Sequence, residues 1–82
     1  MPTPPYPIQL ALQIMDAWLG LPEYTYKATV YRFAQALPPD EVLVAVEIAQ
    51  AKFPGGGMSA LKYFCGVCHS KIKEERIRLS WN

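Results

Sequence analysis

The residues whose types and spacing could carry out chemistry are gathered in one short string, Cys65-Gly66-Val67-Cys68-His69. It matches the C-x-x-C-H motif of c-type haem proteins, in which two thiols bind the haem vinyl groups and the imidazole ligates iron. Covalent haem attachment normally follows export, and the N-terminal segment has neither a basic start nor an uninterrupted apolar stretch typical of a secretory signal. Haem c is therefore one alternative for this string.

Zinc is a second alternative for the same side chains. Thiols at positions i and i+3 and an imidazole at i+4 lie near one another on a helix, as the ligands of one metal ion must. A closed structural zinc site takes four protein ligands. The chain contains two cysteines and one histidine, so a carboxylate or a second copy of the chain would have to complete the site.

Core packing is the third alternative, and it is the interpretation that we adopt. Free cysteine is among the most frequently buried residue types. On a helix, Cys65 and Cys68 fall in the same stripe as Leu61, Phe64 and Ile72. We therefore expect no cofactor and no metal, with His69 as an ordinary polar residue at the edge of the stripe.

No other motif indicates catalysis. The sequence has no Ser/His/Asp arrangement that can be placed and no G-x-x-x-x-G-K-[ST] phosphate loop, and its carboxylates are scattered. The glycines at 55–57 lack both a following lysine and a preceding strand, so we interpret this segment as a hinge. We expect the protein not to be an enzyme.

The apolar periodicity predicts an all-α fold, a compact bundle of about four short helices in one domain at residues 8–82. The predicted helices span residues 8–19, 25–37, 41–53 and 60–79. Thr25 and Ser59 are the expected N-caps of the second and fourth. Proline alternates with small or aromatic residues at positions 1–7, which predicts an extended Pro-rich N-terminal arm.

Each predicted helix has an apolar stripe that should face the core. Val44 and Ile48 lie on a different side of the third helix, which predicts a central helix or a second face that binds a partner. The stripe residues are, in helix order, Leu10, Ala11, Ile14, Met15 and Trp18; Tyr26, Val30, Phe33, Ala34 and Leu37; Val42, Ala45, Val46, Ala49 and Phe53; and Leu61, Phe64, Cys65, Cys68, Ile72 and Leu79.

Composition and charge narrow the function classes. The chain is 51% hydrophobic with a formal net charge of +1, which excludes a disordered acidic or basic tail. Residues 1–61 carry three cations and five anions, whereas residues 62–82 carry five cations and two anions. No apolar stretch approaches the length of a membrane span. We expect a cytoplasmic protein whose C-terminal part could bind a polyanion.

Two sets of residues are candidates for binding nucleic acid. On the second helix, Lys27, Tyr31 and Gln35 form a row with Arg32 beside it, and such side chains pair with phosphates, stack on bases and hydrogen-bond base edges. The last helix supplies a second set of basic residues, which we expect to spread around the helix as a basic tail. Trp81 follows this set, and we expect it to fold back or to anchor a partner. This second set is Lys62, Lys71, Lys73, Arg76 and Arg78.

The segment at 60–68, of sequence ALKYFCGVC, continued by KIKE at 71–74, resembles the closing helix of small helical modules in phage and mobile-element proteins, including DnaD-like replication accessory proteins. The resemblance extends over residues 40–75. It implies a context of DNA replication or processing, with the cysteines as packing residues. His69 departs from the pattern, which would place a large aromatic residue or an arginine there.

Together these features predict a non-enzymatic, nucleic-acid-binding accessory module of a larger assembly. The main alternative is a protein-interaction module, namely an adaptor, an inhibitor or a homo-oligomer that uses Val44 and Ile48. The second alternative is a haem c or zinc protein that uses Cys65, Cys68 and His69.

Overall fold

The computed structural model describes the backbone of residues 6–80 and the side chains of residues 6–77. Within this range the chain forms four helices and no strand, which confirms the all-α bundle. No helix in the described range combines the length and apolar character needed to cross a bilayer. The helices are α1 (Tyr6–Leu19), α2 (Glu23–Ala36), α3 (Pro39–Lys52) and α4 (Met58–Ser80).

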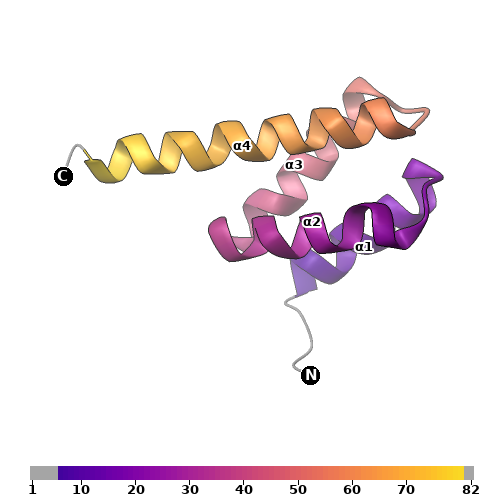
Figure 1. The fold of residues 1–82 in the computed structure, drawn as a ribbon, viewed down its shortest axis with the longest axis horizontal. Coiled ribbons are helices and arrows are strands. Elements are labelled where there is room, and N and C mark those ends of the chain that lie inside the picture. The colour runs from indigo at the N-terminus through magenta and orange to yellow at the C-terminus, as the bar shows by residue number, and fades with distance from the viewer. Residues whose placement is uncertain (1–5, 81–82) are drawn as a thin grey trace.

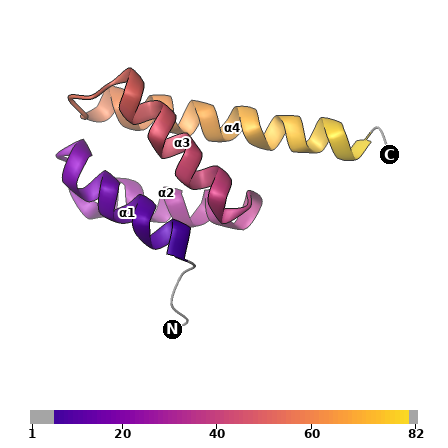
Figure 2. The same ribbon diagram turned by 180° about the vertical axis from the view of Figure 1, so that it is seen from behind.

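The helices form two layers. Helices α2 and α4 occupy the face turned to the viewer in Figure 1, and α1 and α3 occupy the opposite face, which Figure 2 shows. Helix α3 packs against both α1 and α4 and is the central element of the bundle. The C-terminal part of α4 extends beyond the other three helices (Figure 1).

Helix α1 begins at Tyr6, so the predicted arm at residues 1–7 is wrong at its last two positions. Pro7 lies in the first turn of the helix, where the missing N–H costs no hydrogen bond and the fixed φ favours helical geometry. The remainder of the predicted arm, residues 1–5, lies outside the described residues, as does Trp81.

Two predicted N-caps are also wrong. Helix α2 begins at Glu23 after Pro22, and the Thr25 N–H donates to the Pro22 carbonyl at 2.9 Å. Proline supplies the backbone conformation and Glu23 complements the positive end of the helix dipole, so the helix begins two residues before Thr25. Ser59 lies inside the first turn of α4. Helix α3 begins at Pro39, two residues before the predicted start at residue 41.

The core draws on all four helices and contains the predicted stripes of α2 and α3, apart from the partly buried Ala34 and Phe53. The predicted stripe of α1 is displaced: Ala11 and Met15 are buried, whereas Leu10, Ile14 and Trp18 are only partly buried. Helix α4 contributes its first half to the core. Among residues 6–77, the buried ones are Ile8, Ala11, Met15, Leu19, Tyr26, Val30, Phe33, Leu37, Val42, Ala45, Val46, Ala49, Ala60, Leu61, Phe64 and Cys68.

The loop between α3 and α4 is fixed to the C-terminal end of α1. The Trp18 Nε1–H donates to the carbonyl of Phe53 at 2.8 Å, and the Gly57 N–H donates to the carbonyl of Leu19 at 2.9 Å. The second bond satisfies a carbonyl that the end of α1 leaves without a helical partner. These two hydrogen bonds connect the loop that contains the glycines at 55–57 to the end of α1.

Candidate nucleic-acid interface

The two thiols face the interior. Cys68 is fully buried, and Cys65 is half-buried against the same core cluster. Burial raises the pKa of the Cys68 thiol to about 12, with a further contribution from Cys65 and an opposing one from Lys71. Burial also raises the pKa of the Cys65 thiol. Both groups are therefore protonated at neutral pH, and a protonated thiol is a poor nucleophile and a poor metal ligand.

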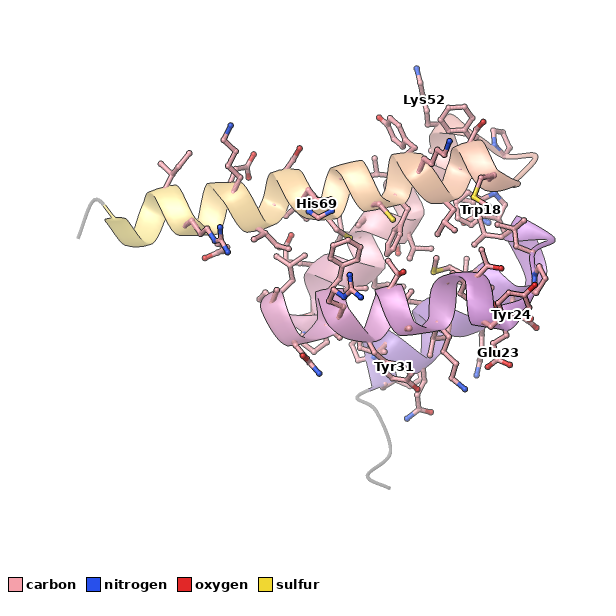
Figure 3. All side chains as sticks on the ribbon, viewed as in Figure 1. Trp18, Glu23, Tyr24, Tyr31, Lys52 and His69 are labelled. Atoms are coloured by element: carbon pink, nitrogen blue, oxygen red, sulfur yellow. The ribbon has the colours of Figure 1, made fainter. Side chains whose placement is uncertain are left out.

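His69 points outward and does not share a site with Cys68. Its ring makes an edge-to-face contact with Phe33, with centroids 5.2 Å apart and an interplanar angle of 84°. Figure 3 shows His69 between α4 and α2. Among the described residues, no group of three or more Cys, His, Asp or Glu side chains is arranged to hold a metal ion. The side chain of His69 instead joins the exposed surfaces of α2 and α4.

The predicted row on α2 is exposed, but its charge is offset. Lys27 forms an ion pair with Glu23 at 2.9 Å, and this hydrogen bond and charge raise the pKa of Lys27. Tyr31 is 36% exposed and Gln35 is also exposed. Figure 3 shows Tyr31 on the side of α2 turned away from α4. The row thus provides aromatic and polar contacts with little free positive charge.

The basic residues of α4 divide into two groups, which corrects the prediction that they spread around the helix as a basic tail. Lys71 faces α3 and pairs with Glu41 at 2.6 Å. Lys62, Lys73 and Arg76 are exposed and lie within a sector of about 60° of the helix, at 100° per residue. His69 falls in the same sector. The side chain of Arg78 lies outside the described residues.

We define the basic face as Arg32, Lys62, His69, Lys73 and Arg76. Arg32 is the contribution of α2, and it directly precedes Phe33, the residue that contacts His69. Within the described part of the chain, none of the four permanent cations of this face has a carboxylate within ion-pair distance. Their charge is therefore available to a polyanion.

A second, apolar surface lies on the other layer. Val44 is 39% exposed and Ile48 is 40% exposed, as expected for a second face of the third helix. Figure 2 shows α3 in front, on the side of the molecule opposite α2 and α4. Beside it on α4, Tyr63 rests edge-on against Phe53, with ring centroids 5.4 Å apart. We define the outer face of α3 as Asp40, Val44, Ile48 and Lys52, which follow one another at intervals of four residues.

The structure also forms a shallow hollow between α1 and α2, lined in part by Asp16, Glu23 and Tyr26. The Tyr26 hydroxyl donates to the Asp16 carboxylate at 3.3 Å. Burial, followed by the charge of Asp16, raises the pKa of Tyr26. No sequence motif links these residues, since they come from separate helices. The hollow is acidic and lies apart from the basic face, so it does not contribute to binding a polyanion.

Comparisons with known proteins add no family to this picture: no protein-family model, no curated protein and no solved structure matches the chain. The resemblance of residues 40–75 to DnaD-like modules therefore stays a prediction. The function has to be argued from the basic face and the outer face of α3.

Proposed function

We propose that this protein is a non-enzymatic nucleic-acid-binding module that acts as an accessory in a larger assembly. The observation that carries the proposal is the basic face, where Arg32, Lys62, Lys73 and Arg76 have no carboxylate partner among the described residues. Cations that are exposed and unpaired bind phosphates with release of counterions, which is the main source of sequence-independent affinity.

The dimensions of this face suit a nucleic-acid backbone. From Lys62 to Arg76, α4 rises about 21 Å at 1.5 Å per residue. The same length corresponds to about six base pairs of duplex at 3.4 Å per step along one strand. Arg32 and His69 broaden the face toward α2, and the imidazole can hydrogen-bond a phosphate or a base edge.

The α2 row lies on the side of α2 turned away from α4, and we propose that it contacts nucleic acid that extends from the basic face past Arg32. Tyr31 offers a ring for stacking and Gln35 offers an amide for base edges. Lys27 and Lys71 contribute less because each is paired with a carboxylate. A cytoplasmic location and a role in replication or processing of phage or mobile-element DNA complete the proposal, and the support for this context is the resemblance of residues 40–75.

Fluorescence anisotropy with labelled single-stranded and duplex oligonucleotides tests the proposal. At about 50 mM salt we expect micromolar binding, and Lys73→Gln should weaken it about three- to tenfold. Lys52→Gln is the matched control, because it removes the same charge from an exposed site at the end of α3, away from His69 (Figure 3). Absence of binding at low salt, or equal effects of both substitutions, would contradict the proposal.

A second candidate function is a protein-interaction module, and the exposure of Val44 and Ile48 favours it. Val44 and Ile48 are two aliphatic side chains about 40% exposed on the central helix. The surface of a partner protein would remove them from water, which is favourable. Ile48→Asp should then remove a partner that co-purifies with the wild-type protein, whereas Lys73→Gln should not.

A further inference from the structure

The row of residues that defines the outer face of α3 has a symmetric pattern of charge, and the exposed Glu47 lies beside this row. Its four residues form one row along the helix, in the order Asp40, Val44, Ile48, Lys52. The row therefore has an acidic end, two apolar residues and a basic end. Neither Asp40 nor Lys52 has an ion-pair partner among the described residues, whereas the nearby Glu41 is paired with Lys71. Both ends of the row are available to a second molecule.

We propose that a second copy of this chain covers the outer face of α3, with the two α3 helices antiparallel about a two-fold axis that passes between Val44 and Ile48. The proposal deepens the protein-interaction candidate, on which it rests, by naming the partner. In this arrangement Asp40 faces the partner's Lys52, and Val44 faces the partner's Ile48. A two-fold interface of this kind brings the same patch of both subunits together.

A single two-fold axis generates both the contact between positions 40 and 52 and the contact between positions 44 and 48, because the two pairs have the same midpoint in the sequence. Rows of residues spaced by four are also the ridges that interlock in the commonest mode of helix packing. An antiparallel pair sets the helix dipoles in opposition, which is favourable. A parallel copy would instead place Asp40 beside the partner's Asp40, and like charges in contact are destabilising.

The size of this face predicts a weak dimer. A helix of 14 residues is about 21 Å long, and a contact limited to α3 and the adjacent part of α4 falls below the roughly 1,200 Å² of stable interfaces. We therefore expect a dissociation constant of about 10–100 µM. The basic face lies on the other layer (Figures 1 and 2), so dimerisation leaves it accessible on both subunits.

Sedimentation velocity on the full chain between about 5 and 500 µM, a range that brackets this dissociation constant, measures the association. The wild type should change from monomer to dimer, and Ile48→Asp should weaken the dimer at least about tenfold. Ile77→Asp is the matched control: Ile77 is 48% exposed but lies on the projecting part of α4, so this variant should dimerise normally. Circular dichroism establishes that both variants are folded.

Charge exchange tests the antiparallel arrangement. Asp40→Lys and Lys52→Asp alone should each weaken the dimer about three- to tenfold, since each places like charges opposite one another. An equimolar mixture of these two variants should associate as well as the wild type, because every facing pair is then complementary.

Three results would overturn the proposal. The first is a wild-type protein that stays monomeric throughout this range. The second is a mixture of Asp40→Lys and Lys52→Asp that associates no better than either variant alone. The third is a purified monomer that nevertheless loses a co-purifying protein on Ile48→Asp, which would leave the interaction function standing and reject a second copy as its partner.

Discussion

Gly56 occupies a backbone conformation that side chains disfavour, with φ at +73° in the loop that joins α3 to α4. A Cβ at this position would lie 2.1 Å from the carbonyl oxygen of Trp18. Gly56→Ala must therefore shift the loop and strain the adjacent hydrogen bond from Gly57 to Leu19. We expect it to lower the free energy of unfolding by about 2–4 kcal/mol, measured by urea denaturation.

Substitutions at Gly20 and Gly55 distinguish the energetic cost of a positive φ from the cost of a steric clash. Gly20 also has a positive φ of +68° but nothing within 4 Å of its added Cβ, so Gly20→Ala should cost about 1 kcal/mol. Gly55 has neither constraint, and Gly55→Ala should change stability by less than about 0.5 kcal/mol. Equal losses for the substitutions at Gly56 and Gly20 would show that the contact with Trp18 is unimportant.

Because of Cys68, the free energy of unfolding should decrease as the pH rises through the alkaline range. A thiol is neutral when protonated, so a pKa raised from 9.0 to about 12 lets the folded state keep a proton that the unfolded state loses. Stability is then complete below about pH 9 and falls as pH rises toward 12, by up to about 1.4 kcal/mol per pH unit.

Urea unfolding of the wild type and of Cys68→Ala measures this effect at about pH 8, below the window in which the thiol titrates, and at about pH 10.5, inside that window. The variant lacks the titrating group, so its stability should fall less over this interval. The raised pKa of Tyr26 acts in the same direction in both proteins and cancels in the comparison. Identical losses in the two proteins would contradict the expected contribution of Cys68.

At the scale of the elements, the two halves of α4 should differ in stability. Among the described side chains of α4, the buried ones are Ala60, Leu61, Phe64 and Cys68, which all lie in the first half, and Ile72 is partly buried after them. The C-terminal part of the helix projects past the bundle (Figure 1). We expect amides at 74–80 to exchange hydrogen at least about tenfold faster than those at 61–70, measured by NMR. Uniform protection along α4 would contradict this difference.

The sequence was sufficient for the number of helices and for most of their buried sides, because each depends on local periodicity. Val30 and Phe33 on α2 and Val42 and Val46 on α3 are buried as their spacing predicts. The starts of α2 and α4 were misplaced, since an early proline or methionine competes with Thr25 or Ser59 through small energies that local rules do not rank.

The displaced stripe of α1 has a tertiary cause. Trp18 lies at the edge of the core because its indole N–H bonds to the carbonyl of Phe53, 35 residues away. That position turns Leu19 inward, where it is 2% exposed. A contact between residues so far apart in the sequence leaves no periodic signal, so the sequence alone could not predict it.

At the scale of the whole molecule, the candidate site was predictable in part. The exposed cations of α2 and α4 could be named from the sequence, but which of them keep free charge depends on the fold. Lys71 is matched with Glu41, 30 residues earlier, only because α3 and α4 pack together. His69 joins the two helices through Phe33, a contact that its place in a C-x-x-C-H string did not indicate.

The two surfaces give the molecule two sides with different chemistry. The basic face lies on the layer of α2 and α4, and the outer face of α3 lies on the opposite layer (Figures 1 and 2). A protein of this form could bind nucleic acid on one side and a second copy on the other. Substitutions on one side should therefore leave the other activity unchanged, since the two sets of residues are not in contact.

The salt dependence of nucleic-acid affinity tests the central claim most directly. With about four phosphate contacts from Arg32, Lys62, Lys73 and Arg76, log K plotted against log salt should have a slope of about −3. Replacing Lys62, Lys73 and Arg76 together by glutamine should reduce the slope to about −1 and the low-salt affinity by at least about 30-fold. A slope near zero for the wild type, or an unchanged slope in the triple variant, would contradict the assignment of the basic face.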